Sequence, residues 1–206
     1  MGKMTQSLHI FQRIESCRLC KDQFARTPTA HVPRPVLQGQ TSARILIAGQ
    51  APGLRVHVSG CPFTDASGDR LRHWMGLSEK IFYDSEQIAI IPMAFCFPGY
   101  SKSKADLPPP KICARTWRQE VLEAFDKIEL TILVGRYAQQ WHLGTTKAVS
   151  DVVRQYTAWG PHILPLPHPS WRNTHWLTTN PWFDQDVVPY LRRRVQEILS
   201  DRSNHT

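Results

Sequence analysis

Four short apolar runs recur along the chain, and each is bounded by glycine, proline or charged residues. The runs cover residues 45–48, 88–91, 130–134 and 162–166. Runs of this length that lack a polar alternation are typical of strands buried on both faces of a parallel sheet. Pro165 interrupts the fourth run, so we expect this strand to be short and to resemble an edge strand.

Stretches with apolar residues at helical spacing separate these runs. The predicted helices cover residues 5–20, 68–76, 113–127, 136–141 and 187–199. Strands that alternate with helices predict an α/β fold, with a parallel sheet and helices on both of its faces. The length favours a single domain, 1–206, in which residues 1–41 form an N-terminal helix and a proline-rich, extended segment from Lys21 to Thr41.

The first run ends in an unusual turn, Gly49-Gln50-Ala51-Pro52-Gly53. Its glycines supply backbone freedom and its proline fixes φ, so the turn is expected to be tight. In an open α/β sheet, the loops at the carboxyl ends of the strands form the ligand crevice. We therefore expect this turn at an active site, where the loops after the other three runs converge on it. The alternative is a turn that only joins a strand to a helix.

The net charge of the chain indicates what kind of partner it binds. Lysine and arginine exceed aspartate and glutamate, which gives a formal net charge of +8. A basic protein favours a polyanionic partner, nucleic acid first, although such charge also serves solubility alone. The sequence has no run of about 18 apolar residues and no secretory h-region, so we expect a cytoplasmic protein that has no membrane partner.

The five cysteines are an odd number, which argues against a disulfide framework in a reducing compartment. Cys17 and Cys20 form a Cys-x-x-Cys pair, a spacing that indicates a metal or redox site.

Five basic residues lie close together farther along the chain, and their charge is suited to phosphate contacts, although an ordinary solvated face has the same composition. They are Lys102, Lys104, Lys111, Arg115 and Arg118.

Three motifs in this order resemble the uracil-DNA glycosylase superfamily. They are the Gly-Gln-Ala-Pro-Gly turn, the stretch Gly60-Cys61-Pro62-Phe63, and His168-Pro169-Ser170 after the fourth run. The nearest resemblance is to the iron–sulfur branch, family 4, which carries GEAPG, GRPF and a late HP motif. The resemblance implies a three-layer α/β/α sandwich around a four-stranded parallel sheet. It also implies a monofunctional DNA glycosylase of base excision repair, and we expect a monomer.

An enzyme of this kind flips a deaminated base, uracil or hypoxanthine, out of DNA and hydrolyses its N-glycosidic bond, because a base inside a duplex cannot be reached. Two alternatives remain. One is a non-catalytic iron–sulfur DNA-binding member of the superfamily. The other is a hydrolase of nucleotides, against which the basic charge argues.

The resemblance also assigns roles to individual residues. Phe63 would stack on the flipped base, unless it is a core phenylalanine, and His168 would donate a hydrogen bond to the base carbonyl. Trp171 would enter the duplex as a wedge, unless it packs on Trp176 or Trp182. The remaining residues of the predicted base pocket and of the DNA-contacting surface are Gly49, Ala51, Pro52, Gly53, Ser170, Lys102, Lys104, Arg115 and Arg172.

The chain departs from its relatives at the residues that would place the water. Gln50 stands where family 4 has glutamate, and Ala51 stands where the family 1 motif GQDPY has aspartate. Pro92 replaces the asparagine that reads the uracil edge in family 4. The nearest carboxylate is Asp65, which resembles the aspartate of the FTGD stretch in family 5 with an offset of one residue. Asp65 would place the water or cap the following helix, and Gln50 would orient the water through its amide.

Four cysteines match the family 4 cluster ligands in order: Cys17, Cys20, Cys96 and Cys113. The resemblance implies that they hold a [4Fe–4S] cluster with a structural role. A structural zinc ion is the alternative, since zinc also takes four thiolates and spacing does not separate the two. Cys61 has no partner in this scheme and is expected to be a packed free thiol.

Overall fold

A four-stranded sheet forms the centre of the molecule, which we describe from a computed structural model over residues 10–200. The strands are β1 (Ile45–Ala48), β2 (Ile88–Ile90), β3 (Leu130–Val134) and β4 (Ile163–Leu166), in the order β2-β1-β3-β4. All three pairings are parallel, with Ile45 opposite both Ile88 and Leu130. The predicted parallel sheet is confirmed, and Pro165 does lie in an edge strand.

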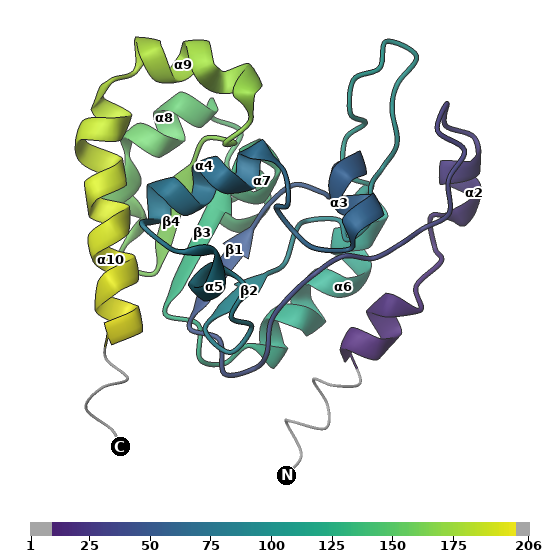
Figure 1. The fold of residues 1–206 in the computed structure, drawn as a ribbon, viewed down its shortest axis with the longest axis horizontal. Coiled ribbons are helices and arrows are strands. Elements are labelled where there is room, and N and C mark those ends of the chain that lie inside the picture. Colours follow the sequence, from purple (N-terminus) through teal and green to yellow (C-terminus); the bar gives the residue numbers. More distant parts are fainter. Residues whose placement is uncertain (1–9, 201–206) are drawn as a thin grey trace.

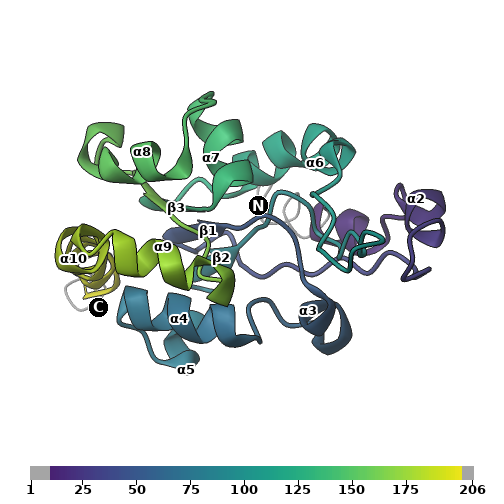
Figure 2. The same cartoon turned by 90° about the horizontal axis from the view of Figure 1, so that it is seen from above.

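Helices cover both faces of this sheet (Figures 1 and 2). Figure 2 shows α6, α7 and α8 on one side of the strands and α4, α5 and α10 on the other, which is the predicted three-layer α/β/α arrangement. The helices in chain order are α2 (Lys21–Ala25), α3 (Leu54–Ser59), α4 (Ala66–Met75), α5 (Glu79–Phe82), α6 (Lys111–Ala124), α7 (Arg136–Leu143), α8 (Val149–Arg154), α9 (Thr174–Thr179) and α10 (Val188–Ser200).

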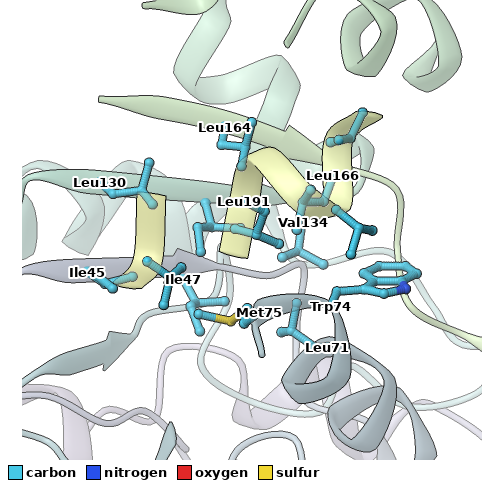
Figure 3. Close-up of a cluster of buried hydrophobic side chains, with 14 of the residues drawn as sticks. Ile45, Ile47, Leu71, Trp74, Met75, Leu130, Val134, Leu164, Leu166 and Leu191 are labelled. Atoms are coloured by element: carbon cyan, nitrogen blue, oxygen red, sulfur yellow. The ribbon is translucent and has the colours of Figure 1, made fainter. Parts of the chain in front are cut away.

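Alternation along the strands divides the core between the two faces. Ile45 and Ile47 point to the side of α4 and α10, where they join Leu71, Met75 and Leu191 in the cluster of Figure 3. The intervening residue Leu46 belongs to a second cluster, together with residues of α6 and of the helix at 10–15: Ile10, Ile14, Trp117 and Val121. Burial on both faces explains why the strands are apolar without interruption.

Several element boundaries differ from the sequence prediction for local reasons. The first helix is seen at residues 10–15, and its predicted part at residues 5–9 lies outside the described residues. The segment Lys21–Thr41 was predicted to be extended, but α2 forms a short helix at its start, where Phe24 is buried. The helix predicted at 113–127 begins at Lys111 instead, and Pro110 is its N-cap residue. Proline is tolerated at the start of a helix, because the backbone N–H that it lacks would have no partner inside the helix there.

The basic segment after β2 forms a hairpin that the sequence did not predict. Ser101 N donates to Ala105 O over 2.8 Å, and Leu107 N donates to Gly99 O over 2.9 Å. Figure 1 shows this teal hairpin standing at the same end of the molecule as α9. Within residues 10–200, no helix is long and apolar enough to cross a membrane.

Candidate active site

A cavity of about 390 Å³ lies where the loops after the strands meet. Most of the residues that the sequence predicted for the active site line this one cavity. They are Gly49, Gln50, Ala51, Pro52, Gly53, Phe63, Asp65, His168, Ser170, Trp171 and Arg172. The fold therefore brings the late motif at 168–170, which follows the first two motifs by more than 100 residues, to the same cavity. The loops after β1, β2 and β4 meet there as predicted, whereas no residue of the loop after β3 lines the cavity.

The first turn is fixed from one side by the segment that follows β2. Met93 N donates to Gly49 O over 2.9 Å, and Ala94 N donates to Gln50 O over 3.0 Å. A Cβ added to Gly49 would lie 3.5 Å from the ring of Phe63, at ordinary van der Waals distance, so the ring lies directly beside the turn. Gln50 consequently stands on a backbone that two hydrogen bonds hold in place.

Phe63 has a left-handed backbone with φ of +54°, a conformation that costs a bulky residue free energy. Tyr83 Oη donates to Phe63 O over 3.0 Å, and this carbonyl packs against Gly68, where an added Cβ would lie only 1.8 Å away. The ring lines the cavity and also contacts the core edge-on, 6.2 Å from the ring of Phe82. Both interpretations of Phe63 therefore describe part of its environment.

Asp65 is the N-cap of α4 and lines the cavity as well. Its Oδ1 accepts from Ser67 N over 3.1 Å and from Gly68 N over 3.3 Å, and Ser67 Oγ donates to the same oxygen. The capping role is thus present in the structure, and it occupies one of the two carboxylate oxygens. It also explains why α4 begins at Ala66, before the predicted start.

His168 is half-buried at the cavity wall, and its hydrogen bonds define its tautomer. Ser170 N donates to His168 Nδ1 over 3.2 Å, so a neutral imidazole must carry its hydrogen on Nε2. Burial lowers the pKa of His168, whereas the charges of Asp65 and Asp106 act to raise it. The lowered pKa favours the neutral ring, which has one hydrogen-bond donor at Nε2.

An ion pair joins two loops at the cavity. Arg172 Nη1 lies 3.7 Å from Asp106 Oδ2, and both residues line the cavity. The side chain of Trp171 is 73% exposed, whereas Trp176 and Trp182 pack on each other at 5.7 Å. The structure thus does not show the packed alternative for Trp171. No site role was predicted for Asp106, whose only signal in the sequence is that its carboxylate interrupts a run of lysines.

The predicted DNA-contacting lysines lie outside the cavity lining. Lys102 and Lys104 are exposed on the hairpin 99–107, and Arg115 is exposed on α6. Arg118, which the sequence grouped with this basic run, is only 1% exposed. Neither a phosphate contact nor a solvated face, the two interpretations of the basic run, describes Arg118, because a helix of this kind turns every third or fourth residue toward the core.

The four predicted ligand cysteines gather around a second, smaller cavity of about 20 Å³. Burial raises the pKa of the Cys96 thiol to about 12 and that of Cys113 to about 12, and the charges of Cys17 and Cys20 add to the effect. Four soft sulfur donors in an apolar pocket are a suitable donor set for a metal–thiolate group. Among residues 10–200, no group of three or more His, Cys, Asp or Glu is already placed to hold a metal ion. Cys61 is a half-buried free thiol outside this pocket.

Among the models of known protein families, that of the Uracil DNA glycosylase superfamily matches residues 37–192. This range includes the whole cavity lining except Val36. It also includes Cys96 and Cys113, but it leaves out Cys17 and Cys20.

Proposed function

The chain belongs to the uracil-DNA glycosylase superfamily, and we propose that it is a DNA glycosylase that removes a deaminated base, uracil or hypoxanthine, from DNA. Members of this superfamily are generally DNA glycosylases. The observation that carries the proposal is the meeting of the Gln50 turn, Phe63 and His168 around one cavity. An extruded base would enter this cavity, since its glycosidic bond cannot be reached inside a duplex.

The geometry suggests how the base would be held and released. Phe63 offers its ring face, and stacking of a base on an aromatic ring contributes about 1–3 kcal/mol. Negative charge develops on the base as the glycosidic bond breaks. His168, with Nε2–H as its one donor, would stabilise this charge, and the loss of one such donor typically costs about 10²–10³-fold in rate.

Two residues are candidates for placing the attacking water. Asp65 has one oxygen occupied by the cap of α4, so a water would have to be held by its other oxygen, Oδ2. Gln50 has no charge, but its amide can orient a water from a backbone that Met93 and Ala94 fix. We propose Asp65 as the group that activates the water and Gln50 as a group that orients it.

Single-turnover cleavage by three variants tests these roles. We expect Asp65→Asn and His168→Ala each to lower the rate by about 10²-fold or more, and Gln50→Ala to lower it less. Asparagine is also a good N-cap, so Asp65→Asn keeps α4 while it removes the charge. If Asp65→Asn is fully active and Gln50→Ala is inactive, Gln50 and not Asp65 is the residue that places the attacking water. Full activity of His168→Ala would reject the whole mechanism.

The substrate is tested with oligonucleotides that each contain one uracil, hypoxanthine or xanthine. Incubation with the protein, followed by alkali, should nick at least one of them. If none is nicked although the protein binds the same DNA, the chain is a non-catalytic DNA-binding member of the superfamily. The replacement of the usual carboxylates by Gln50 and Ala51 keeps this second possibility open.

We further propose membership of the family 4 branch, with a [4Fe–4S] cluster held by the four cysteines of the smaller cavity. Bound there, the cluster would tie the segment at Cys17 and Cys20 to α6 and to the loop after β2. Iron and acid-labile sulfide in anaerobically purified protein would support the cluster. Stoichiometric zinc without iron would instead show that the four cysteines hold a structural zinc ion. Iron binding that needs Cys61 but not Cys113 would show that the ligands are different.

A further inference from the structure

Arg118 of α6 is the one charged side chain that is fully buried among residues 10–200. Burial lowers its pKa to about 10, which still leaves the guanidinium charged at neutral pH. None of the ion pairs in this part of the chain includes Arg118. A buried charge without a carboxylate partner is costly, so its remaining contacts indicate what it does.

The guanidinium bonds mainly to the segment that directly follows β2. Its Nη1 donates to Ile91 O over 2.6 Å and to Pro92 O over 3.3 Å. Its Nη2 donates to His142 Nε2 over 2.7 Å. Burial and the charge of Arg118 lower the pKa of His142 to about 3, so this imidazole is neutral and Nε2 can accept. Hydrogen bonds from a charged donor are stronger than neutral ones, so this contact fixes the two carbonyls firmly.

The next two residues of the same segment hold the Gln50 turn, Gly49–Gly53, in place. Met93 N donates to Gly49 O and Ala94 N donates to Gln50 O, at 2.9 and 3.0 Å. Pro92 itself lines the cavity. A short, continuous path therefore leads from the buried guanidinium, through four consecutive residues, to the backbone of Gln50.

We propose that Arg118 is a positioning residue for the Gln50 turn. By fixing the carbonyls of Ile91 and Pro92, it sets the place of the amides that hold Gly49 and Gln50, and so the wall of the cavity against which the base lies. The expected effect of Arg118 on the cleavage rate rests on the proposed glycosylase function, whereas its effect on the position of the turn does not.

The test compares Arg118→Met, Arg118→Lys and Gln119→Met by two measurements. Gln119 is the matched control, because it is the next residue of α6 and its side chain is exposed and bonds only to Glu123. Amide hydrogen exchange at Met93 and Ala94 reports on the path itself. Steady-state cleavage of the best modified oligonucleotide, with kcat and KM measured separately, reports on its use.

We expect Arg118→Met to speed exchange at both amides and to lower kcat, on the order of 10²-fold, with little change in KM, because small misplacements cost rate more than binding. Arg118→Lys keeps the charge but not the forked geometry, and should restore exchange protection and kcat only in part. Gln119→Met should resemble the wild type in both measurements.

Unchanged exchange and unchanged kcat in Arg118→Met would overturn the proposal, and so would a rise in KM alone. If the wild type cleaves no modified base, the glycosylase function fails, and hydrogen exchange still decides whether Arg118 holds the turn. If Arg118→Met does not fold, His142→Leu takes its place. It removes the ring nitrogen that accepts from the guanidinium and should produce a smaller change of the same kind.

Discussion

At the scale of single residues, His168 shows how burial and one hydrogen bond select a chemical state. Protonation would place a hydrogen on Nδ1, directly against the N–H of Ser170 that now donates to it. Burial lowers the pKa of His168 from its ordinary value of 6.5. Because the pKa is lowered, the neutral form persists to more acidic pH than for an exposed histidine.

The single-turnover cleavage rate should therefore decrease as the pH falls, with its half-maximal value below pH 6.5, the ordinary pKa of histidine. The measurement is a pH–rate profile on the best substrate, with binding of product DNA as a control for loss of DNA affinity. An acid limb whose midpoint lies above pH 6.5 would show that neutral His168 is not what limits the reaction.

Gly68 is a second residue whose environment has a clear consequence, because it leaves no space for a side chain. A Cβ at this position would lie 1.8 Å from Phe63 O, whereas a Cβ at Gly144 would meet nothing within 4 Å. Gly68 lies inside α4, whereas Gly144 is the C-cap of α7 and has a left-handed backbone. The pair therefore compares a backbone clash with the cost of a left-handed alanine.

We expect Gly68→Ala to unfold at clearly lower denaturant concentration than the wild type and to lose base binding, because Phe63 must move. Gly144→Ala has a φ of +59° and should cost only about 1 kcal/mol in unfolding free energy. Chemical denaturation of both variants makes the comparison, and equal losses would mean that the Phe63 loop yields without strain.

At the scale of elements, the sequence predicted most of what lies near the sheet. The four strands are buried on both faces, so their composition alone distinguishes them from helices. Short helices were harder to predict: α2 has five residues, and a single buried side chain, Phe24, decides its place. The predicted site residues meet because loops at one end of a parallel sheet must converge.

What the sequence did not predict depends on contacts between distant elements. Arg118 is one of several basic residues in a row, and only the packing of α6 shows that it faces inward. Asp106 reaches the cavity because the hairpin 99–107 pairs it with Tyr100 and returns the chain to the cavity wall, and no local pattern encodes that path. Side chains that act through tertiary contacts are therefore the ones that sequence reasoning misses.

At the scale of the whole molecule, the formal net charge of +8 is expected to set the affinity for DNA. Lys102, Lys104 and Arg115 are exposed and do not line the cavity, so they are free to contact phosphates without touching the base. Each phosphate contact contributes about 0.9 to the slope of log K against log salt on duplex DNA.

Removing all three charges should lower this slope by roughly 2–3 and weaken binding to DNA of any sequence. Binding isotherms at several salt concentrations provide the measurement. Replacing Lys80, Lys127 and Lys147, which are exposed and also outside the cavity lining, gives a control with the same change in net charge. An unchanged slope in the first variant would place the DNA-binding surface elsewhere on the molecule.

The ion pair between Arg172 and Asp106 has a kinetic consequence for the capture of a base. Both side chains are about half exposed, and such pairs contribute about 0–1 kcal/mol. A free-energy difference of this size leaves the separated form at no less than about one molecule in six. The two side chains therefore separate and meet again continually in the free protein, so this ion pair alone does not close the mouth of the cavity to an incoming DNA strand.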